Sequence, residues 1–270
     1  MCGSTKATVL VVLALLSTFG LACGPSAREL RRGVWFVGDF ESGDLAGWDG
    51  DLARPRSAVV VSNPVRGGRH AVRIELAPGD RGANKERAEL KVGDKEIERV
   101  RGGPGGEIWY GWSLFVPREF ALGRESPIVA QWHHRPSPAA SRPWKRIHAT
   151  GAPPLTLYLI SDHDRLALLL VGRSAPRADQ RILGSRPIRR DSWIDLAFHI
   201  RWSMADDGFV EAWLDGRPFT AGRMRGATLY GELSNVLRLG LYRPKGSAST
   251  TDHLFLDEVR LGDSRAAVVP

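Results

Sequence analysis

Three short motifs, far apart in the chain, contain the residue types that acid–base chemistry requires. They are Arg87-Ala88-Glu89-Leu90, Gln131-Trp132-His133 and Arg238-Leu239-Gly240-Leu241-Tyr242. Each motif lies in a stretch that reads as a β-strand, in which residues i and i+2 point to the same face. A sheet that places these faces side by side would bring together a cation, an amide, an imidazole and a phenol. Such a set suits the abstraction of a proton next to a carboxylate.

The elements that must position these motifs are strands. Short alternating runs, separated by Gly, Pro and Asp turns, dominate from Val34 onward and predict an all-β sandwich or barrel. The Asp-Gly pair at 215–216 predicts a hairpin turn, and Asp206-Asp207-Gly208 predicts another. Two irregular stretches, 79–85 and 135–154, are expected to be loops that contact a ligand. The predicted strands are Ala58–Val61, His70–Leu76, Ile108–Val116, Ser126–His133, Leu155–Ile160, Leu166–Val171, Trp193–Trp202, Phe209–Leu214, Val236–Tyr242 and His253–Leu261.

The N-terminus has the pattern of an export signal. Lys6 precedes an apolar run from Val9 to Leu16, which is too short to span a bilayer and fits a signal peptide. Residues 1–22 are therefore predicted to be removed, and 23–33 to form a polar tether. Cys23 follows a small residue, as in a bacterial lipoprotein processing site, although Gly20 and Leu21 depart from the usual pattern.

Cysteine usage and charge agree with an exported protein. Of the two cysteines, Cys2 leaves with the signal, so that Cys23 has no partner for an intrachain disulfide. Lipid attachment would explain the presence of this single cysteine. The chain would be an outer-membrane or cell-surface lipoprotein of a bacterium, or a secreted protein with a spare thiol. The net charge is +8, or +7 without Lys6, which favours an acidic partner. An exported location argues against nucleic acid, and we expect a monomer.

Several longer stretches resemble one family. Five stretches resemble polysaccharide lyases of the heparin lyase I and glucuronan lyase type. Three are internal, namely Glu107–Pro117, Trp193–Ser203 and Val210–Gly216, and two are the ends, Asp39–Trp48 and His253–Gly262. The three motifs are similar to the R-x-E-L, Q-x-H and K-x-G-x-Y motifs of related alginate lyases, with Arg238 where Lys is usual. The resemblance implies one domain over residues 34–264, a β-jelly roll with a concanavalin A-like sandwich of two antiparallel sheets. Asp39–Trp48 would be the first strand, paired with the last.

The mechanism that the resemblance implies is β-elimination in a uronic-acid polysaccharide, within a groove. Arg87 and Gln131 would bind the uronate carboxylate and stabilise the developing enolate. His133 would act as the base or neutralise the carboxylate, and Tyr242 would protonate the leaving O4 or act as the base itself. Which of the two is the base stays open, with His134 as a rival to His133.

Further residues are candidates for binding the substrate. Glu89 and Arg238 belong to the motifs, and Trp132, which alternates away from them, is expected in the core. The other candidates are Lys245, His134, His199, Asn84 and Lys85. The carboxylates of Asp39, Glu41 and Asp257 offer the hard oxygen ligands of a structural Ca²⁺.

Two other functions remain possible for the same sandwich, because a fold does not fix a function. A non-catalytic carbohydrate-binding or laminin-G-like module would need stacking aromatic residues and no acid–base set. A glycoside hydrolase would need two carboxylates across the scissile bond, and the Glu-x-Asp-x-Glu strand usual for this fold is absent. Asp257-Glu258 is a poor substitute, because adjacent strand residues point to opposite faces. The sequence does not distinguish one uronate polymer from another, or endo from exo action.

Overall fold

The computed structural model describes residues 1, 32–80, 86–92, 102–123, 125–134, 152–163, 165–175, 177–232, 234–243 and 249–270. The predicted signal segment and Cys23 lie outside the described residues, as do most of the tether and of the two predicted loops. Within the described part, no helix is long and apolar enough to cross a membrane.

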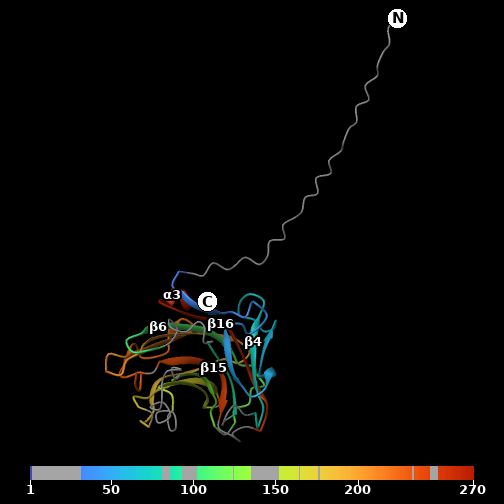
Figure 1. The fold of residues 1–270 in the computed structure, drawn as a ribbon. Helices are drawn as coiled ribbons and strands as arrows, with labels where there is room; N and C mark the ends of the chain where they lie inside the picture. Colours follow the sequence, from blue (N-terminus) through green and yellow to red (C-terminus); the bar gives the residue numbers. More distant parts are fainter. Residues whose placement is uncertain are drawn as a thin grey trace. The chain divides into compact units, whose positions relative to one another are not determined.

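Two antiparallel sheets pack face to face and confirm the predicted all-β jelly-roll sandwich (Figure 1). One sheet contains, in spatial order, β13 (Arg217–Pro218), β12 (Phe209–Leu214), β11 (Trp193–Arg201), β6 (Glu107–Phe115), β16 (Asp252–Gly262), β4 (Ala71–Leu76) and β3 (Ala58–Val61); β1 (Val34–Gly38) pairs with β16, and β14 (Met224–Arg225) with β12. The other sheet runs β10 (Arg181–Pro187), β9 (Arg165–Gly172), β8 (Leu155–Asp162), β7 (Ile128–His134), β15 (Asn235–Arg243), β5 (Glu86–Val92) and β2 (Trp48–Leu52). A 3-10 turn, Pro55–Ser57, and a short C-terminal helix, α3 (Arg265–Val268), complete the described elements.

The two ends of the domain pair as the resemblance implies, but not through the predicted first strand. β1 pairs with β16, whereas the segment that follows it, residues 39–47, is a turn. Gly43 and Gly47 have positive φ angles there, and the Asp44 carboxylate accepts the Ala46 N–H, which are features of turns rather than of strands. The predicted hairpin at Asp215-Gly216 is confirmed, because both residues have positive φ angles, 48° and 73°.

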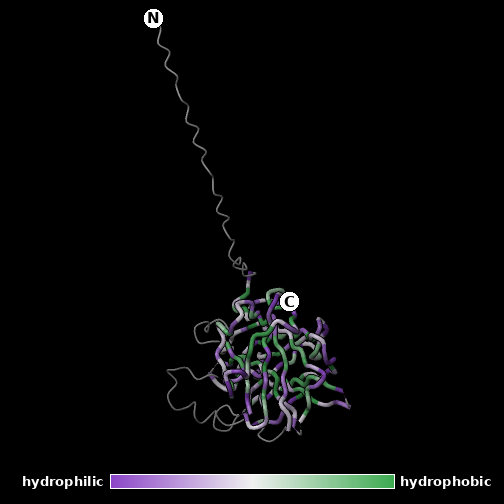
Figure 2. The backbone as a smooth tube through the Cα atoms, turned by 90° about the vertical axis from the view of Figure 1, so that its right-hand side faces the viewer, coloured by the Kyte–Doolittle hydropathy of each residue, from purple (hydrophilic) through white to green (hydrophobic). Residues whose placement is uncertain are grey.

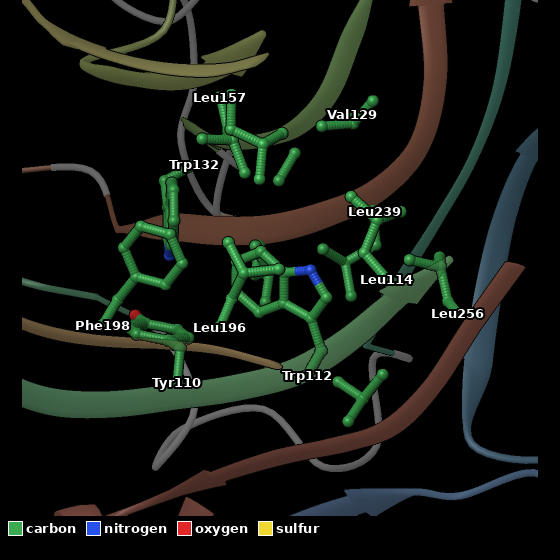
Figure 3. Close-up of a cluster of buried hydrophobic side chains, with 14 of the residues drawn as sticks. Tyr110, Trp112, Leu114, Val129, Trp132, Leu157, Leu196, Phe198, Leu239 and Leu256 are labelled. Carbon is green, nitrogen blue, oxygen red and sulfur yellow. The ribbon is translucent and has the colours of Figure 1, made fainter. Parts of the chain in front are cut away.

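Aromatic side chains fill the space between the sheets (Figure 3). Trp132 of β7 is fully buried, as predicted, and packs edge-on against Phe198 of β11, with ring centroids 5.0 Å apart. Trp112 of β6 stacks on the same Phe198 at 4.9 Å. The buried Tyr110 hydroxyl accepts a hydrogen bond from Trp202 Nε1 at 3.0 Å, so that its polar atom is satisfied inside the core.

Hydrophobic and hydrophilic residues are interspersed along the strands (Figure 2), and side chains of successive residues point to opposite faces of a sheet. In β5, Ala88, Leu90 and Val92 are buried toward the core, while Arg87 and Lys91 are only half-buried. The same period in β15 buries Leu237, Leu239 and Leu241. The face of the seven-stranded sheet that points away from the core therefore carries Arg87, Glu89, Lys91 and Arg238, whereas Glu86 and Arg243 are buried on the core side.

Candidate active site

The three motifs meet on this outer face, because β5, β15 and β7 are neighbours in one sheet. Tyr242 pairs with Arg87, Gly240 with Glu89, and Arg238 with both Lys91 and Gln131. Directly opposite residues of antiparallel strands point to the same face. The register thus gathers residues that are more than a hundred positions apart in the sequence.

Glu89 lies at the centre of the cluster. Only 2% of its surface is exposed, and its Oε1 accepts a hydrogen bond from Gln131 Nε2 at 2.5 Å. Its Oε2 is 3.1 Å from Arg87 Nε and 3.9 Å from Arg238 Nη1. Burial raises the pKa of Glu89, and the charges of the two arginines and the Gln131 amide act in the opposite direction. Glu89 therefore contacts Gln131 and both arginines, and can hold these three side chains in position.

Asp51 of β2 is a member of this cluster that the sequence did not reveal. It lies opposite Glu89, and its Oδ2 accepts a hydrogen bond from Arg87 Nη1 at 2.7 Å. The same oxygen is 3.8 Å from Arg238 Nη1. Two carboxylates thus hold two guanidinium groups in place, so that the arginines are fixed before any ligand binds.

Arg87 also covers the phenol ring of Tyr242. The guanidinium carbon is 4.5 Å from the ring centroid, which is a cation–π contact. Tyr242 also lines an open cleft of about 410 Å³, together with the apolar residues Ile128, Ile160 and Leu169 and the polar residues Glu125, Ser126, Tyr158 and Gln180. The phenol therefore belongs both to the charged cluster and to a cleft large enough for a sugar residue.

Gly240 explains why the third motif contains a glycine. Its φ angle of 145° is one that other residues rarely adopt, and a Cβ atom there would collide with the carbonyl oxygen of Ala88. The pairing of β15 with β7 also shifts register between Leu239 and Tyr242. Any side chain at position 240 would force β15 away from β5, and with it Tyr242 away from Arg87.

His133 is half-buried on the same face of β7 as Gln131, but lies farther from Tyr242. It pairs with Val236, whereas Tyr242 pairs with Ile128. At about 3.3 Å per residue, the backbone positions of His133 and Tyr242 are roughly 16–20 Å apart along the strand direction. The imidazole and the phenol therefore lie toward opposite ends of the cluster, with Gln131 between them.

Not every predicted substrate-binding residue belongs to this cluster. His199 is in β11 of the other sheet, where its ring nitrogens lie 2.6 Å from Glu107 and 3.3 Å from Glu211, and its ring stacks on Trp109 at 4.1 Å. The expectation that His199 faces the same groove is wrong, because the strand alternation gives the face but not the sheet. Lys245, Asn84, Lys85 and the side chain of His134 lie outside the described residues.

The three carboxylates expected to hold Ca²⁺ fit this ion poorly. Asp257 accepts hydrogen bonds from the backbone N–H groups of Arg66, Gly67 and Glu258. Glu41 accepts those of Arg69 and His70, and Asp39 accepts that of Glu41. The N–H donors place partial positive charge next to these oxygens, in the position that a cation would occupy. In the described ranges, no group of three or more His, Cys, Asp or Glu residues is arranged to hold a metal.

This geometry predicts how the protein responds to chelation. We expect an excess of EDTA to leave the melting temperature unchanged, because backbone donors rather than a metal satisfy Glu41 and Asp257. The measurement is a thermal melt with EDTA, after dialysis, and again with added Ca²⁺. A lower melting temperature in EDTA that added Ca²⁺ restores would contradict it.

Comparisons with known proteins agree with this geometry. A family model described as polysaccharide lyase matches residues 40–260. The chain belongs to this family. The match covers the three motifs and lies within the single domain that the sequence predicted over residues 34–264. The protein is therefore a lyase that acts on polysaccharides.

Solved structures of low sequence identity share the fold of this lyase. An endo-β-1,4-glucuronan lyase from the fungus Trichoderma reesei is 20% identical, with a TM-score of 0.60, over 88% of this chain and 98% of that chain. Alginate lyase A1-II′ is 12% identical, with a TM-score of 0.60, over 85% and 99%. An alginate lyase from Pseudomonas aeruginosa is 15% identical, with a TM-score of 0.51, over 82% and 100%. No curated protein matches the chain.

Proposed function

We propose that this lyase cleaves a uronic-acid polysaccharide by β-elimination at the Arg87–Gln131–Tyr242 cluster. The observation that supports the proposal is the convergence of two arginines and an amide beside a phenol on one sheet face. Solved structures with the same fold are of a glucuronan lyase and of alginate lyases, whose substrates are uronate polymers.

The first requirement of β-elimination is to neutralise the uronate carboxylate, because its negative charge makes the C5 proton poorly acidic. The amide of Gln131 has two N–H groups, of which one is bound to Glu89. The second N–H and the positive charges of Arg87 and Arg238 would stabilise the carboxylate as it gains enolate character. Groups that are fixed in advance lose no reorganisation energy at this step, which makes such electrostatic stabilisation effective.

The second requirement is proton transfer at both ends of the breaking bond. We assign the base to His133 and the acid to Tyr242. The C5 proton and O4 belong to neighbouring carbons, so both side chains must extend along the sheet face toward the same sugar ring. His133 takes the C5 proton, the electron pair forms the C4=C5 double bond, and the C4–O4 bond breaks. Tyr242 then gives its proton to O4 of the departing chain.

The cleft next to Tyr242 would hold a neighbouring sugar residue. Its volume of about 410 Å³ suits a pyranose, whose apolar face could pack on Tyr158, Ile128 and Ile160. Its polar lining residues, Ser126 and Gln180, could bind the sugar hydroxyl groups. Two neighbouring sugars bound on either side of the phenol would place the glycosidic oxygen beside its hydroxyl.

Mass spectrometry of the products tests this reaction type. The purified protein is incubated with glucuronan, alginate, a sulfated uronate glycan and a neutral glucan. β-Elimination yields a fragment with a C4=C5 double bond, lighter by one water than the hydrolysis product, from a uronate polymer only. Saturated fragments would show a hydrolase, and retention of the polymer without any fragment would favour a carbohydrate-binding module.

A conservative change at Glu89 tests its positioning role. We expect Glu89→Gln to lower kcat about 10- to 100-fold, because Arg87 would lose the negative charge that it pairs with, and a single amide oxygen would remain as acceptor for both Gln131 and Arg87. Steady-state kinetics should show the loss in kcat rather than in KM alone. Glu75→Gln, on a half-buried residue of β4 in the other sheet, is the matched control and should leave kcat unchanged. Equal kcat values for the two variants would contradict the role.

We also propose that the protein is exported, is anchored by a lipid on Cys23, and acts as a monomer. The support is the short apolar run after Lys6 and the small residue before a single remaining cysteine. Intact-mass analysis of the protein from a bacterial membrane fraction tests the anchor, with Cys23→Ser as the control. A processed wild-type chain without lipid mass would overturn it.

A further inference from the structure

We propose that this lyase has a second binding groove for the acidic polysaccharide, separate from the Arg87–Tyr242 cluster. The groove has a volume of about 650 Å³ and is lined by Arg186, Ile188, Arg189, Trp193, Asp215 and Arg217. It lies where β10, the last strand of the seven-stranded sheet, meets the start of β11 and the end of β12. The polysaccharide as ligand rests on the proposed function.

The lining of this basic groove has the chemistry that recognises an acidic sugar chain. Its described lining residues include three arginines and one aspartate, and two of the arginines, Arg189 and Arg217, are exposed. A guanidinium group pairs with a carboxylate or a sulfate through two parallel hydrogen bonds. The half-buried ring of Trp193 offers a face on which a pyranose can stack.

One wall of the basic groove is held rigidly by the segment between β10 and β11. Arg190 Nη1 donates to the carbonyl oxygens of Pro117 and Phe120, at 3.2 and 2.7 Å. The next residue, Asp191, accepts the backbone N–H of Arg118 at 2.7 Å. These bonds fix the segment that carries Arg189, so the wall is formed before a ligand arrives.

The opposite wall is the hairpin between β12 and β13. The backbone N–H of Asp215 donates to the Asp195 carbonyl at 2.8 Å, and the Asp195 N–H donates back to Asp215 Oδ1 at 2.9 Å. Arg186 Nη2 reaches across to the carbonyl oxygen of Pro218 at 2.6 Å and ties β10 to β13. A preformed groove loses little entropy on binding, which favours a function in recognition.

Distance separates the basic groove from the proposed catalytic cluster. Four strand-to-strand steps lie between β10 and β15, which amounts to about 19 Å at about 4.8 Å per step. A long polymer can occupy both places, whereas a short oligosaccharide fills the catalytic cluster alone. Occupation of two linked sites raises the overall affinity without any change in the chemistry of cleavage.

The test compares two pairs of arginines. Arg189→Ser/Arg217→Ser removes two exposed charges of the basic groove, and Arg56→Ser/Arg69→Ser removes two exposed charges elsewhere. Binding to a uronate polymer is measured by affinity electrophoresis, and turnover is measured on the polymer and on the shortest oligosaccharide that is cleaved. We expect the two substitutions in the groove to weaken polymer binding about 10-fold and to raise the KM for the polymer. The turnover of the oligosaccharide should stay unchanged.

Two results would overturn the second groove. One is that the Arg189→Ser/Arg217→Ser variant binds the polymer as tightly as the control variant does. The other is that this variant loses turnover equally on the polymer and on the oligosaccharide. The binding measurement does not depend on cleavage. If the wild-type protein forms no unsaturated product from any polymer but the groove pair alone loses binding, the proposed reaction fails while the groove stands.

Discussion

Tyr242→Phe should lower kcat about 10²- to 10⁴-fold on every polymer that the protein cleaves, because the leaving O4 would lose its proton donor. Phenylalanine keeps the ring that packs under the Arg87 guanidinium, 4.5 Å from the ring centroid, so the cluster should stay in place. The measurement is the initial rate of C4=C5 absorbance at saturating polymer, with the melting temperature recorded in parallel.

The matched change at the other end of the cluster is His133→Ala. If the imidazole removes the C5 proton, kcat should again fall by about 10²- to 10⁴-fold, while KM changes little. His253→Ala, on a half-buried histidine of β16 in the other sheet, is the control, since it removes an imidazole outside the proposed site. A His133→Ala variant with the kcat of the control would show that Tyr242 performs both proton transfers, and would contradict our assignment of the base.

Arg243→Met should destabilise the fold by about 3–5 kcal/mol, because it leaves two buried carboxylates without their partner. The Arg243 side chain is 4% exposed, and its Nε and Nη1 are each 2.7 Å from an oxygen, of Glu86 and Asp252 respectively. Its Nη2 also donates to the Leu76 carbonyl at 3.2 Å. Arg243 therefore joins β5 and β15 of one sheet to β4 and β16 of the other.

The expected loss corresponds to a fall in melting temperature of roughly 10 °C for a domain of this size. Arg56→Met, on an exposed arginine, is the control and should melt close to the wild type. The triple variant Glu86→Gln/Arg243→Met/Asp252→Asn should recover part of the loss, because no charge is then buried unpaired. Equal melting temperatures for Arg243→Met and the control would contradict this role.

This ion pair network also connects stability with the site. Arg243 follows Tyr242 directly, and Glu86 precedes Arg87. Glu86 and Arg243 are fixed between the sheets, whereas their neighbours Arg87 and Tyr242 point to the outer face. The placement of the phenol beside the guanidinium therefore depends on a buried anchor one residue away.

Local patterns were sufficient to predict most of the strands, although not β1, β2 and β10, and the residues that share a face within each predicted strand. Gln131 and Trp132 point to opposite sides of β7 as their alternation predicts, with Trp132 in the core. The Asp-Gly pair at 215–216 has the positive φ angles that its turn type requires. These features depend on a few neighbouring residues, so the sequence alone contains the necessary information.

Features that depend on distant pairing could not be predicted. Asp51 joins the cluster only because β2 pairs with β5, and nothing in Trp48–Leu52 identifies that partner. His199 alternates correctly with its core neighbours, yet its strand belongs to the other sheet. The turn at residues 39–47 resembled a strand of the family, but its glycines and the Asp44 side chain determine the local structure.

The most direct test of the central claim is the ultraviolet absorbance of the C4=C5 product, followed as the purified protein acts on glucuronan and alginate. The proposed reaction predicts a steady rise with the wild-type protein on at least one of these polymers, and almost none with Tyr242→Phe. A Tyr242→Phe protein that produces the unsaturated product at the wild-type rate would contradict the proposed site.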